Sequence, residues 1–298
     1  MDFSSFIGSL AAWFGVRKLS GRRWIKQYGL PHYLNTSRDE ETRYKKWRNP
    51  LYFLKLNRRA VRENFMQYNQ FCPIAKATEI LGERWTILIL RELLLGGRRF
   101  NTLQRGLGDI SPALLTKRLK SLEDQGMVIR RRISGQKGYE YFPTEACEAL
   151  LPVLVSLGEW GLVWARHTIL DPDFDVEFLM LYLERSVDPS KLKGNETILK
   201  FRFSDLAEQR DWWLIVKDGG AEVCLKDPGK EIDVYFNCSV RTLSDVWMGD
   251  RTYREAIQSG DLGVQGDRTL TRNITSWLRP SVFADSPRTL SIAVTGGQ

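Results

Sequence analysis

The sequence is poor in the residues from which metal sites and disulfide frameworks are built. Its 298 residues include only four cysteines and two histidines, and no two cysteines form a CxxC pair. Because zinc sites draw on closely spaced cysteine and histidine ligands, we expect no metal site. Free thiols in a reducing compartment are the default for such cysteines, so we expect a cytoplasmic protein.

Membrane spans and common enzyme signatures are also missing. The apolar run that begins at Trp85 is cut short by Arg91 and Glu92, and no uninterrupted run approaches the ~18 residues that span a membrane. No glycine-rich phosphate loop follows a predicted strand, and no carboxylate pair has a spacing suited to acid–base catalysis. We therefore expect no membrane association, no cofactor and no enzymatic activity.

Positive charge is distributed unevenly around the net charge of +8. Residues 1–65 hold 14 basic and 5 acidic side chains, residues 66–168 hold 14 and 10, and residues 169–298 hold 16 and 21. Ten of the fourteen basic residues in the middle segment lie between Arg98 and Lys137. Such a local basic cluster favours a nucleic-acid partner more strongly than the total charge does.

The stretch 111–126 lies inside this cluster and predicts a helix with two different faces. Ser111 suits the N-cap, Pro112 the first helical position and Gly126 the residue after the helix. At 100° per residue, one face is formed by leucines and the other is small, hydroxylated and cationic. The leucines are Leu114, Leu115, Leu119 and Leu122, and the opposite face holds Ala113, Thr116, Lys117 and Lys120. A solvated amphipathic helix has the same pattern, but the flanking elements favour a helix that enters a DNA major groove.

The flanking elements occur in the order of a winged helix-turn-helix. Helices are predicted over 73–82, 83–95 and 102–107, and the first two would bury Ile74, Ala77, Leu81, Trp85, Leu88, Ile89 and Leu93. A basic hairpin follows the 111–126 helix, with strands over 127–133 and 139–143 around a loop at 134–138. Its cations are Arg130, Arg131, Arg132 and Lys137, for which we favour DNA-backbone or minor-groove contact over a merely solvated strand edge.

Residues 71–168 resemble the HxlR-type family of bacterial transcription regulators. The shared stretches are Cys72-Pro73-Ile74, 82–93, Arg99-Phe100, 110–119, 122–126, Tyr139-Glu140-Tyr141 and 150–154. The resemblance implies a DNA-binding regulator that reads duplex DNA through the 111–126 helix and the hairpin. It also places Cys72 at the position of the redox thiol of thiol-responsive members, although a small buried hydrophobe is the commoner role of a free cysteine.

A long helix is predicted from Thr144 to about His167, kinked at Pro152. Its apolar stripe consists of Leu150, Val153, Leu154, Leu157, Trp160, Gly161 and Trp164. This stripe has more apolar surface than one small winged helix can cover. We therefore predict a homodimer that reads a pseudo-palindromic operator.

Residues 171–298 differ in composition and predict strands covered by helices. Apolar residues alternate with polar ones over 199–203 and 232–239. This half resembles the sterol-carrier-protein-like fold, on residues 233–239, 243–247 and 256–267, which implies an antiparallel sheet and an apolar ligand. The candidate cavity residues are Trp212, Trp213, Phe236, Trp247 and Met248, and only one of the two adjacent tryptophans can point inward.

The expected fold class is thus α+β, in three parts. Residues 1–65 form a basic segment without a strand pattern, either a DNA-gripping arm or sequence upstream of the true start, and we favour the second and expect it to be dispensable. Residues 66–170 form the winged helix, and residues 171–298 the ligand-sensing domain. The competing functions are a lipid or apolar-ligand carrier and a structural interaction protein, in which the basic domain would not be sequence-specific.

Overall fold

A computed structural model describes residues 16–19, 23–26, 67–192, 194–217 and 219–286. The chain divides into two compact units, 1–59 and 60–298. In the first unit, β1 (Val16–Leu19) pairs antiparallel with β2 (Arg23–Lys26). The expectation that this region has no strands was wrong here, because four-residue strands are too short for alternation to be recognised. The other expectations about residues 1–65 lie outside the described residues.

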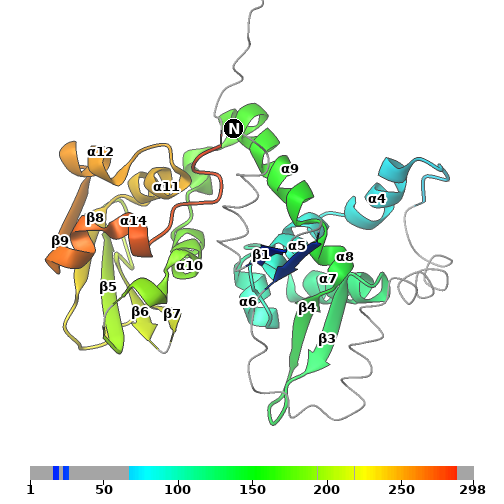
Figure 1. The fold of residues 1–298 in the computed structure, drawn as a ribbon, viewed down its shortest axis with the longest axis horizontal. Coiled ribbons are helices and arrows are strands. Elements are labelled where there is room, and N and C mark those ends of the chain that lie inside the picture. Colours follow the sequence, from blue (N-terminus) through cyan, green and yellow to red (C-terminus); the bar gives the residue numbers. More distant parts are fainter. Residues whose placement is uncertain (1–15, 20–22, 27–66, 193, 218, 287–298) are drawn as a thin grey trace, which may run out of the picture. The chain divides into compact units, whose positions relative to one another are not determined.

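The second unit begins with a winged-helix segment, by which we mean residues 67–170 (Figure 1). Four helices are followed by an antiparallel hairpin, as expected, and then by two helices where one long helix was predicted. They are α4 (Pro73–Leu81), α5 (Thr86–Leu94), α6 (Phe100–Arg105), α7 (Pro112–Asp124), β3 (Val128–Arg132), β4 (Tyr139–Pro143), α8 (Glu145–Glu148) and α9 (Leu151–Trp164). Figure 1 shows the β3–β4 hairpin projecting from the helices as the wing.

Two helix starts differ from the prediction. Helix α5 begins only at Thr86, because Trp85 has a left-handed backbone (φ 77°) that ends the preceding turn. Helix α6 begins at Phe100, with Arg99 as the extended residue before it, so Asn101 lies inside the helix and does not cap it. Both errors concern boundaries, which depend on turn geometry more than on apolar periodicity.

The core of the winged-helix segment is formed by one apolar face from each of α5, α6 and α7. Its most deeply buried members are Ile89, Leu90, Leu93, Leu103, Leu115, Leu119 and Leu122. The predicted inward faces of the first two helices were partly wrong. Ile74 on α4 is 76% exposed, Ala77 and Leu88 are also exposed, and Trp85 is only half-buried. Apolar periodicity identified these faces, but within the described part of the chain Ile74, Ala77 and Leu88 stay uncovered.

The predicted long helix after Thr144 is interrupted between α8 and α9, two residues before Pro152. The whole stretch Glu145–Trp164 is long and apolar enough to cross a membrane, judged by length and composition alone. The expectation that no such stretch exists overlooked it, because Glu148, Pro152 and Glu159 interrupt every continuous apolar run within it.

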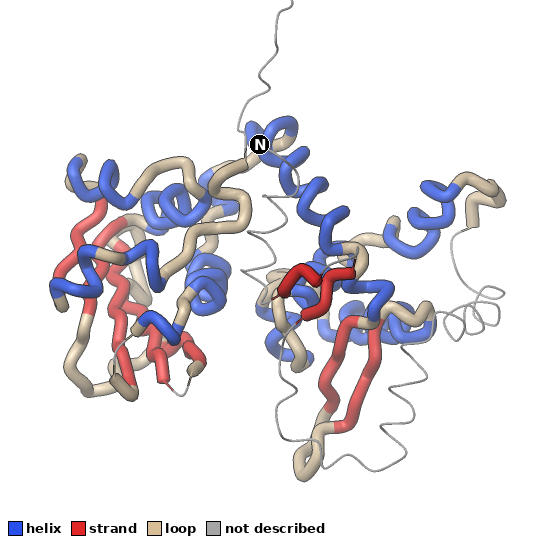
Figure 2. Tube along the Cα trace, viewed as in Figure 1, coloured by secondary structure: helices blue, strands red, loops and turns tan. Residues whose placement is uncertain are grey.

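The remainder of the second unit is a sheet segment, by which we mean residues 171–286. Its five strands are ordered β7-β6-β5-β8-β9 (Figure 2). The strands are β5 (Glu196–Phe203), β6 (Asp211–Lys217), β7 (Gly220–Cys224), β8 (Val234–Cys238) and β9 (Leu262–Gly266). All neighbouring pairs in this sheet are antiparallel except β5 and β8, which run parallel.

Helices of the sheet segment supply the other half of its core. They are α10 (Val176–Ser186), α11 (Val240–Met248), α12 (Tyr253–Gln258), α13 (Arg268–Arg272) and α14 (Ile274–Trp277). The last two are separated by Asn273, which has a non-helical backbone. The segment opens with a short 3-10 turn at Asp171–Asp173.

Strand alternation was predicted correctly and organises this core. Leu199, Phe201 and Phe203 are fully buried on one face of β5. Phe236 on β8 stacks on Phe201 with ring centroids 4.7 Å apart, and its ring lies edge-on to Trp277 at 6.4 Å. Aromatic packing of this kind fills the space between sheet and helices.

We expect the substitution Phe236→Ala to lower the free energy of unfolding by about 3–5 kcal/mol, because it removes a ring that two aromatic neighbours enclose. The matched control is Tyr235→Ala, one residue earlier and 44% exposed, which should cost less than about 1 kcal/mol. Chemical denaturation of the two variants measures the difference. Equal losses would mean that Phe236 is not part of a packed core.

Candidate nucleic-acid interface

Helix α7 has the two faces that its sequence predicts. The Ser111 hydroxyl accepts a hydrogen bond from the Leu114 amide at 3.3 Å and caps the helix. Leu115, Leu119 and Leu122 are buried, whereas Leu114 is only half-buried. The leucines therefore fix the rotation of α7 and present the opposite face to solvent.

The solvent face of α7 carries the predicted DNA-reading residues. Ser111, Pro112, Ala113, Thr116, Lys117 and Lys120 are all exposed. The Thr116 hydroxyl donates to the Pro112 carbonyl at 2.8 Å, and Lys120 pairs with Asp124 at 2.6 Å. Lys117 has no ion-pair partner among the described residues. Of the two lysines, Lys117 is thus the more available cation.

The wing holds its arginines on both faces of the hairpin. Arg130 lies opposite Tyr141 in the ladder and Arg132 opposite Tyr139, so these two share one face, and Arg131 lies on the other. The Arg130 guanidinium is 4.5 Å from the centre of the Tyr139 ring, and its Nε is 3.6 Å from the Glu123 carboxylate of α7. The wing and the end of α7 therefore form one continuous surface.

Arg131 lies over the ring of Phe142 at 4.7 Å, and Arg98, from the turn after α5, lies over the same ring at 5.5 Å. Such cation–ring contacts orient guanidinium groups without neutralising their charge. Lys137 is exposed in the loop at the tip of the wing. The predicted cations are thus spread along the wing, from its base to its tip.

Two side chains of α5 contact the turn between α6 and α7. The Arg91 guanidinium donates to the Gly106 carbonyl at 2.8 Å. The Glu92 carboxylate is fully buried and lies so close to Gly106 that a Cβ at that position would overlap it. Nothing in the sequence pattern distinguishes Glu92, since an acidic residue on a helix is usually solvated.

Cys72 is half-buried and lies immediately before α4, at its N-cap. Lys76, the cation one turn further along the chain, forms a 2.8 Å ion pair with Glu79. All four cysteines are free thiols. The redox role of Cys72 stays a prediction.

The five candidate cavity residues are packed within the sheet segment. Trp212 and Phe236 belong to its core, whereas the Trp213 ring lies under the Lys200 ammonium at 4.9 Å and is not part of that core. Trp247 stacks on Tyr182 at 5.0 Å and donates to the Ser186 hydroxyl at 2.9 Å. Met248 is half-buried after Trp247.

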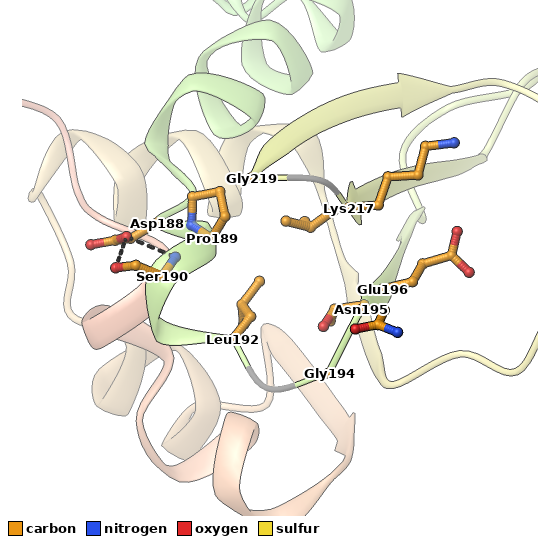
Figure 3. Close-up of a pocket in the computed structure, with 11 residues that line it drawn as sticks. Asp188, Pro189, Ser190, Leu192, Gly194, Asn195, Glu196, Lys217 and Gly219 are labelled. Atoms are coloured by element: carbon orange, nitrogen blue, oxygen red, sulfur yellow. Dashed lines mark hydrogen bonds between the residues drawn. The ribbon is translucent and has the colours of Figure 1, made fainter. Parts of the chain in front are cut away.

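A pocket of about 320 Å³ lies elsewhere in this segment and involves none of those five residues. It is lined by Asp188, Pro189, Ser190, Leu192, Gly194, Asn195, Glu196, Thr197, Val216, Lys217 and Gly219. Figure 3 shows Pro189 and Leu192 facing the hollow, whereas the charged ends of Lys217 and Glu196 point away from it. Within the described residues, no group of three or more His, Cys, Asp or Glu side chains is placed to hold a metal ion.

Comparison with known proteins identifies the winged-helix segment. The HxlR-like helix-turn-helix family matches residues 80–169. The HTH-type transcriptional regulator YvaP of Bacillus subtilis is 36% identical over 108 residues, which cover 36% of this chain and the whole of that protein. The chain belongs to the HxlR-like helix-turn-helix family. It is accordingly a DNA-binding transcriptional regulator.

Two other regulators match about a third of the chain. The HTH-type regulator Rv3095 of Mycobacterium tuberculosis is 43% identical over 89 residues, or 30% of this chain and 56% of that protein. The solved structure of the reduced regulator YodB from B. subtilis is 30% identical, covers 35% of this chain and 98% of that chain, and has a TM-score of 0.28.

The sheet segment matches a different family. Residues 173–283 match the alkyl sulfatase C-terminal family, rather than one named for sterol carriers. The expected resemblance to sterol carriers is therefore replaced here by a match to a domain of an enzyme family. The regulator thus combines two segments that match different families: the winged-helix segment matches the HxlR-like family, and the sheet segment matches the alkyl sulfatase C-terminal family.

We expect Lys117→Ala to weaken binding to duplex DNA and to lower the slope of log affinity against log salt by about one unit, as for one lost phosphate contact. Lys120→Ala should weaken binding less, because Asp124 already neutralises part of its charge. Mobility shifts at several salt concentrations measure both effects, and circular dichroism should stay unchanged. Lys230→Ala, in the sheet segment, is the control, and full affinity in the Lys117 variant would contradict the assignment.

Proposed function

We propose that this regulator is a cytoplasmic homodimer that reads a pseudo-palindromic operator and responds to an apolar effector bound by its sheet segment. The observation that carries the proposal is the exposed cationic face of α7 beside the wing arginines. Lysines and Thr116 on α7 suit base edges and phosphates in the major groove, and the wing arginines suit the backbone or the minor groove.

Exposed apolar surface supports the homodimer. Val153, Leu157, Trp160 and Trp164 are all about half exposed or more, and their spacing places them on one face of α9. Helix α4 has a separate exposed apolar face, with Ile74 and the fully exposed Phe71 before it. Contiguous aromatic and aliphatic surface of this kind is typical of an interface. A second copy is the occupant we favour, because a two-fold dimer presents two α7 helices to two half-sites about one helical turn, or a multiple of it, apart.

We expect Trp160→Glu to give a monomer at micromolar concentration and to lose most operator affinity, because it places a charge in the centre of this face. Light scattering combined with mobility shifts measures both. Leu225→Glu is the control, since Leu225 is about equally exposed but lies in the sheet segment. A Trp160→Glu protein with the mass and the affinity of the wild type would contradict the proposal.

The effector proposal rests on the second family match and on the pocket. The matched family is named for alkyl sulfatases, and an alkyl sulfate carries an apolar chain. The pocket has an apolar side formed by Pro189, Leu192 and Val216, and its volume suits a small ligand. Trp212 and Phe236, two of the earlier cavity candidates, fill the core instead, so we place the effector in this pocket.

Short-chain alkyl sulfates, the matching alcohols and inorganic sulfate separate the two parts of such a ligand. We expect the first two, but not sulfate, to raise the melting temperature of the full chain, since ligand at 100 times its Kd adds about 2.7 kcal/mol. Leu192→Glu should abolish the shift and Leu225→Glu should not. If no alkyl compound binds, the sheet segment is not an apolar sensor.

The alternative function is an apolar-ligand carrier whose winged-helix segment binds DNA without sequence preference. It is distinguished by competition: a carrier would bind its ligand and would release specific and random DNA at the same competitor concentration. A regulator prefers its own operator by orders of magnitude.

A further inference from the structure

A carboxylate buried behind the helix-turn-helix is paired with a cation from the sheet segment. Glu92 on α5 is 0% exposed, and its Oε2 accepts a hydrogen bond from Arg185 on α10 at 2.8 Å. Its Oε1 accepts from the neighbouring Arg91 at 3.0 Å. Arg185 itself is only 14% exposed. A buried carboxylate is costly unless it is paired and hydrogen-bonded, so Glu92 depends on a residue 93 positions away.

This ion pair lies directly against the turn that leads into the DNA-reading helix. The Glu92 carboxylate occupies the space where any side chain at Gly106 would stand. Arg91, which holds one of its oxygens, also holds the Gly106 carbonyl. A shift of Arg185 would therefore displace Gly106, which follows α6 and lies six residues before the first residue of α7.

A second contact joins α10 to the turn between α6 and α7. The ring of Phe178 lies against Gly108, whose backbone is left-handed (φ 64°), about 3.2 Å from where a Cβ would be. Phe178, Tyr182 and Arg185 recur at the spacing of one helix face, and the two rings stack at 6.5 Å. The opposite face of α10, with Leu179, Met180 and Leu183, is buried in the core of the sheet segment.

Helix α10 thus belongs to two packing systems, and it ends beside the pocket. Asp188, which lines the pocket, follows Arg185 by three residues. The Asp188 amide donates to the Trp277 carbonyl at 2.7 Å, and its carboxylate pairs with Arg279. A molecule that displaces this end of α10 would also move the guanidinium that neutralises Glu92.

We propose that Arg185 is a positioning residue whose pairing with Glu92 makes the placement of α7 on DNA depend on the state of the sheet segment. The inference rests on the proposed function and adds its means of regulation. Coupling of two sites requires an element that both can bias, and α10 with its ion pair is that element.

A double-mutant cycle on the full chain tests it. The variants are Arg185→Met, Glu92→Gln and their combination, with operator affinity and thermal unfolding as readouts. We expect each single variant to change operator Kd at least about tenfold, and the double variant to change it no further. Arg185→Lys, which keeps the charge, should restore part of the difference.

The matched control is Arg166→Met, because Arg166 at the end of α9 pairs with Asp250 of the sheet segment but has no part in the Glu92 pair. It should leave operator Kd within about twofold of the wild type. An equal effect of Arg166→Met and Arg185→Met, or an unchanged Kd in folded Arg185→Met, would overturn the inference.

Failure of the proposed function looks different. In that case the wild type itself would bind no duplex DNA with sequence preference, and hydrogen exchange would then decide the inference alone. Faster exchange in the turn 106–110 of Arg185→Met, but not of Arg166→Met, would support the contact as the coupling element. Unchanged exchange at that turn would reject it.

Discussion

The structure depends on one buried charge. Glu92 is enclosed by Arg91, Arg185 and the backbone of Gly106, and each of these partners serves a different part of the fold. Arg91 belongs to the same helix, Gly106 to the turn before α7, and Arg185 to the sheet segment. Without the cations the carboxylate would be left desolvated, which is among the most costly defects a protein interior can have. Its burial is therefore compensated by one cation from each segment, Arg91 and Arg185.

What could be predicted from the sequence was local. The faces of α7 followed from the spacing of Leu115, Leu119 and Leu122, and the core face of β5 from the alternation of Leu199, Phe201 and Phe203. Both patterns report a period of the backbone itself, so they need no knowledge of distant residues. The order of helices and hairpin then left few alternatives to a winged helix.

What could not be predicted was what covers each apolar or charged face. Ile74 lies on a regular apolar stripe and is nevertheless mostly exposed, while Glu92 lies on a helix among leucines and is fully buried. Trp212 and Phe236 were expected at a cavity, but the aromatic rings around them fill that space. Periodicity identifies a face, but what covers that face is decided by residues distant in the sequence, as Arg185 is from Glu92, or by another chain. The exposure of the candidate DNA-contacting residues on α7 could be predicted, because a solvent face needs no such partner.

The buried Glu92 and the exposed apolar side chains have one physical feature in common. A buried carboxylate and an exposed row of aromatic side chains are both unfavourable in an isolated domain, and each is acceptable at an interface. Glu92 resolves the first within the chain, through Arg185. The row from Val153 to Trp164 has no equivalent cover in the described part of the chain. The winged-helix segment thus pairs its buried carboxylate with Arg185 of the sheet segment and leaves an apolar face of α9 exposed.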